Sequence, residues 1–364
     1  MERSNKKLQT FLLFVVFAFV AFVAYLNFSS TLSNGTHLEK FTTDKVEDTI
    51  DTAENTSEVS STECQEAKEQ DADLDKLLPS ATTFKDEIYG DLVWQAKTYA
   101  QPAQHMLDAI ENNYIEPSEK TLLIAVVNHG MLEYILNWIE SLRRSEITKY
   151  LVFAIDQELV DAMTELGLGD HVVLIPEDWR HVQLSGDFAK WKSNDYTPIT
   201  HAKTLIVERL LYLDVTVWFS DVDIVFTSPH IYSHLMWNLR SRKNVDMVFS
   251  QETVQTSINS GFYVMRPTET SKRVIGRTID IQDRIPKLTQ QRVMNRVLGG
   301  MNQDYRQSPM ILLDEMLFPN GHFYFDAKLP TKLGFEPMMV HANYRVGDMK
   351  KKSLQEHGLW YLDE

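Results

Sequence analysis

The sequence predicts an α/β fold, a mainly parallel sheet flanked by helices, and three observations support this prediction. Short runs of consecutive apolar residues alternate with longer segments whose apolar residues recur every three or four positions. The runs are uninterrupted, as expected for strands that are buried on both faces of a parallel sheet. Hydrophobic residues make up 43% of the 364-residue chain, which is enough for a sizeable core.

Each predicted element follows from this alternation. The expected strands are Thr121–Val127, Tyr150–Ile155, His171–Ile175, Val215–Ser220, Asp246–Ser250, Ile258–Met265 and Pro337–Val340. The expected helices are Leu132–Leu142, Gln157–Leu166, a segment that Thr197 caps and Pro198 opens, Glu269–Ile281 and Leu288–Leu298. The helix that follows Thr197 should direct one face inward through Ile199, Ala202, Ile206, Leu210 and Leu213.

The N-terminal region predicts a membrane anchor. Phe11–Leu26 is an unbroken apolar run, and residues 8–28 are long enough to cross a bilayer as a helix. A cleavable signal peptide is the alternative, but cutting after Ala21 or Ala24 places a phenylalanine where a small residue is required. The basic residues precede the run, so residues 1–7 should be a cytoplasmic tail and the remainder lumenal.

Residues 29–80 are predicted to be a disordered lumenal stem, with a single folded domain over residues 81–364. The stem holds thirteen acidic residues and fifteen Ser or Thr, and it cannot bury enough apolar surface to fold. Asn34 and Asn55 begin N-glycosylation sequons there. Cys64, the single cysteine of the chain, is either a free thiol or an interchain bridge that would give a homodimer.

Charge and cysteine content exclude several classes of protein. The formal net charge is −15, which counts against a nucleic-acid partner because such proteins need basic patches to neutralise phosphates. One cysteine excludes a disulfide framework and any zinc or iron–sulfur site built from several cysteines of this chain.

Candidate functional residues stand where strands end, because ligands of open α/β sheets bind beyond the carboxyl ends of the strands. Asn128, Asp156 and the pair Asp221 and Asp223 occupy such positions. Two buried carboxylates need a cation, and oxygen ligands suit Mg²⁺ or Mn²⁺. A structural turn with solvated aspartates is the alternative, since the same Asp-x-Asp pattern occurs at Asp71 in the stem.

Two enzyme classes fit the aspartate pair. A haloacid-dehalogenase-type phosphatase needs the motif on its first strand and a later Gly-Asp-x-x-x-Asp motif, but Gly347-Asp348 is followed by three lysines. A nucleotide-sugar transferase, in which the aspartates hold a metal on the diphosphate, tolerates a preceding nucleotide-binding half, as found here.

From Thr121 onward the chain resembles the nucleotide-diphospho-sugar transferase domain of glycosyltransferase family 77, whose fold is called GT-A. The blocks that carry the resemblance are LLIAVVNHGMLEYILNWIESLRR, NDYTPITHAKTLIVERLL, VWFSDVDIVF, INSGFYVMRP and VHANYRVGDMKKK. The resemblance implies a retaining transferase with a nucleotide-sugar donor, usually a UDP-sugar, a glycan or glycoprotein acceptor and a divalent metal, Mn²⁺ before Mg²⁺. It also implies a single-pass type II protein of the Golgi membrane, or of the endoplasmic reticulum, with a lumenal catalytic domain.

The resemblance implies roles for individual residues of the site. Asp221, Asp223 and His341 match the metal ligands of the family, although a lone histidine can also be a core residue. Residues that would contact the donor are Asn128, Lys203, Asn259, Ser260, Gly261, Gly347, Lys350 and Lys351. For the lysines a solvated surface run is the alternative, and Ser260-Gly261 could be an ordinary turn into a strand.

The sequence departs from the family in one block. Where the family reads Asp-Gln-x-x-Phe-Asn, this chain has Asp314-Glu315-Met-Leu-Phe-Pro319. Asp314 and Glu315 are the candidate catalytic residues, able to stabilise the cationic sugar, with the division of roles between them open. A catalytically silent, lectin-like or scaffolding member of the fold is the alternative function.

Overall fold

The computed structural model describes residues 76, 78, 97–181, 196–299 and 308–363. These residues belong to one compact unit, Glu69–Glu364. Its strands are β1 Thr121–Val127, β2 Leu151–Ala154, β3 Val172–Leu174, β4 Thr216–Ser220, β5 Ile224–Phe226, β6 Met247–Thr253, β7 Ser257–Met265, β8 Met310–Leu312 and β9 Met339–His341.

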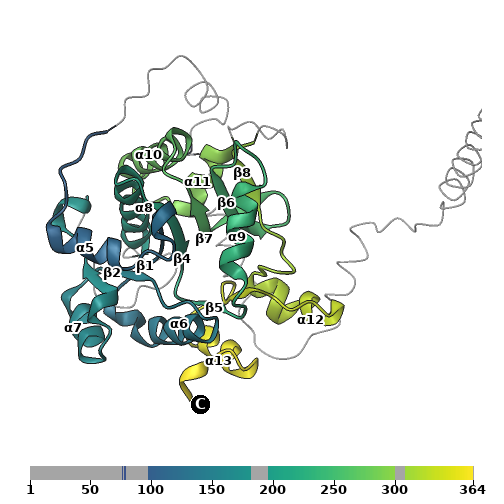
Figure 1. The fold of residues 1–364 in the computed structure, drawn as a ribbon. Helices are drawn as coiled ribbons and strands as arrows, with labels where there is room; N and C mark the ends of the chain where they lie inside the picture. The colour runs from purple at the N-terminus through teal and green to yellow at the C-terminus, as the bar shows by residue number, and fades with distance from the viewer. Residues whose placement is uncertain (1–75, 77, 79–96, 182–195, 300–307, 364) are drawn as a thin grey trace, which may run out of the picture. The chain divides into compact units, whose positions relative to one another are not determined.

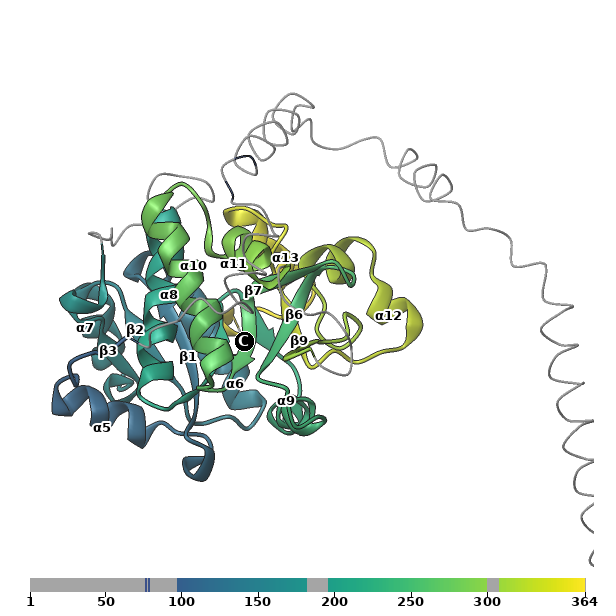
Figure 2. The same ribbon diagram turned by 90° about the horizontal axis from the view of Figure 1, so that it is seen from above.

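Seven strands form one sheet in the order β3-β2-β1-β4-β7-β6-β8, and β5 pairs with β9 in a separate two-stranded sheet (Figure 1 and, for β3 and β9, Figure 2). The pairs β2–β3, β1–β2, β1–β4 and β6–β8 are parallel. β7 is inserted antiparallel between β4 and β6. The predicted α/β class with a mainly parallel sheet is therefore confirmed, and one antiparallel strand, β7, lies within the sheet.

The strands are apolar throughout because helices cover both faces of the sheet (Figure 2). Along β1, Leu122 and Ile124 contribute to one hydrophobic cluster and Leu123 and Ala125 to the other. The first cluster includes residues of α5, α8, α10 and α11, and the second includes residues of α6, α7 and α9. The helices are α5 Gln104–Asn112, α6 Leu132–Arg144, α7 Gln157–Glu165, α8 Tyr196–Tyr212, α9 Ile231–Arg240, α10 Glu269–Arg284, α11 Gln290–Gly299, α12 Leu329–Leu333 and α13 Asp348–Glu356.

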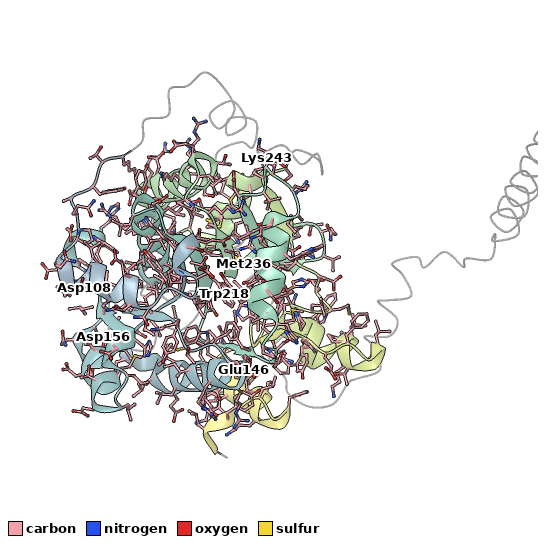
Figure 3. The ribbon with its side chains drawn as sticks, in the orientation of Figure 1. Asp108, Glu146, Asp156, Trp218, Met236 and Lys243 are labelled. Atoms are coloured by element: carbon pink, nitrogen blue, oxygen red, sulfur yellow. The ribbon has the colours of Figure 1, made fainter. Side chains whose placement is uncertain are left out.

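Side chains follow this layering. Trp218 of β4 is fully buried in the cluster that also contains Met236 of α9. Figure 3 shows Trp218 near the middle of the folded unit, whereas Asp108 lies at its edge.

Two sequence predictions need correction at α8. The helix already includes Tyr196, so Thr197 lies within it and is not its N-cap. The predicted single inward face is also too narrow, because Leu205, Val207 and Leu211 are buried as well. The reason is that α8 is packed between the sheet on one side and α10 and α11 on the other.

None of the helices among the described residues is both long and apolar enough to cross a bilayer. The predicted anchor (8–28), the sequons at Asn34 and Asn55, and Cys64 lie outside the described residues. Leu78, within the predicted stem, is buried and belongs to the hydrophobic core, so the folded part includes at least this residue.

Candidate metal and nucleotide-sugar site

The candidate site forms where the two sheets meet. Asp221 follows β4, and its backbone N–H donates to Gly261 O on β7 at 2.7 Å. Asp223 precedes β5, and its carbonyl accepts from Ala342 N, after β9, at 2.9 Å. The short connection between β4 and β5 is therefore fixed on both sides by backbone hydrogen bonds, and its two aspartates have defined positions.

His341 joins the aspartates from the opposite strand of the small sheet. It is the last residue of β9 and pairs with Ile224 of β5. One ligand atom from each of Asp221, Asp223 and His341 lies within 4.8 Å of the others. The side chains of Asp223 and His341 are 8% and 5% exposed, and His341 Nε2 is 3.3 Å from Asp223 Oδ1. The three residues that the sequence predicts as metal ligands thus converge.

Two lysines neutralise the aspartates. Lys203 Nζ on α8 donates to Asp221 Oδ1 at 2.5 Å, and Lys350 Nζ on α13 donates to Asp223 Oδ2 at 2.6 Å. Burial opposes ionisation of Asp223, but Lys350 and His341 outweigh burial and hold the pKa of this carboxyl well below its usual range. Asp223 is therefore an anion, the protonation state that a metal ligand needs.

Gly261 leaves the space in which the ligand atoms gather. A Cβ at this position would lie 2.6 Å from Asp221 Oδ2, 2.7 Å from His341 Cε1 and 2.8 Å from Asn259 Oδ1. Side chains do not approach a Cβ this closely, so the site requires glycine here. Two carboxylates and one imidazole around an open space fit a divalent cation such as Mn²⁺ or Mg²⁺.

The acidic turn Asp314-Glu315 carries the two predicted catalytic residues. Asp314 is exposed, and its Oδ1 accepts from Met316 N at 2.7 Å. Glu315 is buried, its Oε1 accepts from Asn320 Nδ2 at 3.3 Å, and its Oε2 has no hydrogen-bond partner within the described part of the chain. Burial, Asp314 and Glu252 together raise the pKa of Glu315 to about 7.

A family model described as nucleotide-diphospho-sugar transferase matches residues 145–355, more than half of the chain. The chain belongs to this family. The match includes both aspartates, His341, Lys203, Lys350 and the acidic turn. It confirms the family and the enzyme class that the sequence predicts.

Curated relatives are named glycosyltransferases. A UDP-galactose:fucoside alpha-3-galactosyltransferase of Dictyostelium discoideum is 22% identical over 69% of this chain and 44% of its own length. A UDP-D-xylose:L-fucose alpha-1,3-D-xylosyltransferase of Arabidopsis thaliana is 26% identical over 74% of this chain and 75% of its own length. The solved galactosyltransferase LgtC, in complex with donor and acceptor sugar analogs, covers 65% of this chain and 94% of its own at 10% identity and a TM-score of 0.42.

The other residues that the sequence predicts for the transferase site lie on several different elements. Gly347 has φ 55° and ψ −133°, a backbone conformation that glycine adopts readily and other residues rarely adopt. It leads the chain into α13. Asn128 is buried at the carboxyl end of β1. Lys351 Nζ donates to Glu133 Oε2 on α6 at 2.8 Å, a contact away from the aspartates.

Asp156 has a structural role that the strand-end rule does not distinguish from a ligand role. Its carboxylate accepts from Leu159 N and from His129 N, each at 2.9 Å, and so caps α7. Figure 3 shows Asp156 beside α7.

The sequence analysis missed a residue that links the aspartate pair to the acidic turn of the transferase site. Glu252, near the end of β6, accepts at Oε2 from Asn259 Nδ2 and from Asn343 Nδ2, and its carbonyl accepts from Asn320 Nδ2. Asn259 Oδ1 in turn accepts from Gly261 N at 2.7 Å. A hydrogen-bonded path therefore runs from the aspartates to the acidic turn. Ser260 N donates to Gln291 Oε1, which ties the same strand to α11.

Gly261→Ala is expected to lower activity of the transferase about 10-fold or more, because the methyl group would displace ligand atoms by tenths of an ångström and misplacement of that size is costly. Steady-state assays with varied metal concentration would measure it, with the apparent metal affinity falling in parallel. Gly299→Ala is the matched control, since a Cβ there meets nothing within 4 Å. Unchanged metal dependence in Gly261→Ala would contradict this role for the glycine.

Proposed function

We propose that this protein is a metal-dependent, retaining glycosyltransferase that moves a sugar from a UDP-sugar to a glycan or glycoprotein acceptor. The observation that carries the proposal is the convergence of Asp221, Asp223 and His341 on one space at the end of β4. Two lysines at the same place add the positive charge that a diphosphate needs. The nucleotide-sugar relatives support the class of donor.

The charge balance of the site favours a nucleotide sugar. Asp221 and Asp223 cancel Lys203 and Lys350, so a bound divalent cation leaves two positive charges. The diphosphate of a nucleotide sugar is a diester with two negative charges. Once a cation neutralises the aspartates, both ammonium groups become available to phosphate oxygens.

The metal would supply a Lewis acid that stabilises charge on the departing diphosphate. The chain would supply the remaining interactions. Lys350 contributes positive charge from α13, and Lys203 does so from α8. Asn259 and Ser260 would line the sugar pocket, and Glu315, largely protonated below pH 7, would face the sugar as a hydrogen-bonding group.

Hydrolysis of UDP-sugars in the presence of Mn²⁺ or Mg²⁺ tests this function. We expect release of UDP from one UDP-sugar, abolished by chelation and restored by Mn²⁺. UDP binding without turnover for every sugar would instead indicate a catalytically silent, lectin-like member. The proposal would be overturned if the protein neither bound nor hydrolysed any UDP-sugar.

The proposed location is the Golgi membrane, or the endoplasmic reticulum, with residues 8–28 as a type II anchor and the site in the lumen. The sequence supports it through the basic residues before the apolar run. Endoglycosidase treatment should then raise gel mobility of the expressed protein, and Asn34→Gln with Asn55→Gln should remove the shift. If neither Asn34 nor Asn55 carried a glycan, that result would count against this orientation.

A further inference from the structure

A second cluster of metal-ligating side chains lies away from the aspartates. His181 follows the short helical turn Glu177–Trp179, His201 lies in the second turn of α8, and Asp283 is near the end of α10. Their ligand atoms all lie within 4.8 Å of one another. The three residues come from separate parts of the chain, and the packing of α10 on α8 brings two of them together.

The spacing of the ligand atoms suits a small cation. His181 Nδ1 is 2.8 Å and His201 Nε2 is 3.2 Å from the same oxygen, Asp283 Oδ1. In a tetrahedral zinc site with bonds of about 2.0–2.1 Å, ligand atoms are about 3.3 Å apart. Small rotations of the side chains are therefore enough to place a cation among them.

His201 supplies an independent reason to expect a ligand. Its side chain is 9% exposed. Although Nε2 is near Asp283, the direction does not suit a hydrogen bond, and this buried nitrogen has no hydrogen-bond partner among the residues that the structure describes. Leaving such an atom unpaired costs free energy, which binding to a metal would recover.

We propose that His181, His201 and Asp283 bind a zinc ion, with water in the fourth position. Imidazole nitrogens suit Zn²⁺, whereas the site at Asp221 and Asp223 is richer in carboxylate oxygen and suits Mn²⁺ or Mg²⁺. The two sites therefore differ in the metal that their ligand atoms suit best. Zinc here would tie α8 to α10 near the turn that carries Lys203.

Metal titration of the full-length protein in detergent, without a polyhistidine tag, tests this site. Co²⁺ is the probe, because tetrahedral Co²⁺ has strong visible absorption. We expect one tetrahedral Co²⁺ per chain in the Asp221→Asn variant, which disables the other site, and its displacement by Zn²⁺ but not by Mg²⁺. His181→Gln and Asp283→Asn, each at a half-exposed position, should abolish that absorption and the rise in melting temperature that Zn²⁺ causes.

The matched control is His322→Gln. His322 and Asp326 also form a histidine–carboxylate pair, at 3.3 Å, and the group of three that includes His181 does not extend to them. This variant should keep the full absorption and the full zinc-induced shift. Absence of tetrahedral Co²⁺ in Asp221→Asn, or its persistence in both Asp283→Asn and His181→Gln, would overturn the proposal and leave the cluster as a hydrogen-bonded contact between helices.

Discussion

Asp223→Asn is expected to slow sugar transfer at least 100-fold, a loss of about 3 kcal/mol of transition-state stabilisation. The substitution keeps the size of the side chain but removes a full negative charge from a buried carboxylate between Lys350 and His341. Steady-state turnover on the best UDP-sugar, with Mn²⁺ varied, measures the loss. Higher Mn²⁺ should not restore the wild-type rate.

The same variant should also be less stable, by roughly 2 kcal/mol, because it breaks a buried ion pair while Lys350 can still reach solvent. Chemical denaturation would measure this. Asp221→Asn separates the two effects, since Asp221 is 25% exposed and should lose activity with a smaller loss of stability. Asp214→Asn, in an exposed pair with Lys120, is the control and should change neither. Wild-type, metal-dependent turnover in Asp223→Asn would show that the aspartate pair is structural.

Glu315→Gln is expected to stabilise the protein at pH 8 by up to about 3 kcal/mol. The pKa of Glu315 rises from 4.5 in an unperturbed glutamate to about 7 in the folded protein. Folding therefore favours the protonated form, and the wild type loses stability as pH rises from 4.5 to 7. Glutamine cannot ionise, so the difference between the two proteins should vanish below pH 4.5. Denaturation at a series of pH values measures it.

The activity of Glu315→Gln should show a related pH dependence. A protonated glutamate resembles glutamine, the residue that the family pattern has at this position, in shape and in hydrogen-bonding groups. Wild-type turnover should fall above about pH 7, and the glutamine variant should lack this fall. Asp314→Asn should move the fall to lower pH, because Asp314 helps to raise the pKa of Glu315. A 100-fold loss at every pH in Glu315→Gln would mean that the carboxylate itself acts on the sugar.

Periodicity predicted the parts of the fold in which burial is continuous. The first strand was bounded correctly at Thr121 and Val127, because seven buried residues leave little ambiguity. Two of the three-residue strands, β5 and β8, and the separate β5–β9 sheet were not predicted, because so few residues carry no detectable period. The insertion of β7 between β4 and β6 depends on pairing between distant residues, which a local pattern does not contain.

The residues that converge at the candidate metal site were predictable from the sequence, and the residues around them were less so. Asp221 and Asp223 end a buried strand, and the resemblance supplied His341. Glu252 was missed because the predicted strand ended at Ser250, whereas β6 continues to Thr253. The amide that the family pattern places at residue 319 is found one residue later, at Asn320, while the carbonyl of Pro319 accepts from His341 N.

The pairing of Asp223 with Lys350 joins residues 127 positions apart in the chain. During synthesis the four parallel strands β1–β4 are therefore available long before His341 and Lys350 emerge. A nascent chain has both aspartates and Lys203 but lacks His341 and Lys350, which we propose complete the site for the metal and the donor. We therefore expect affinity for the donor to arise only when α13 docks. A transferase cleaved before residue 341 would keep its central strands but would not bind a nucleotide sugar.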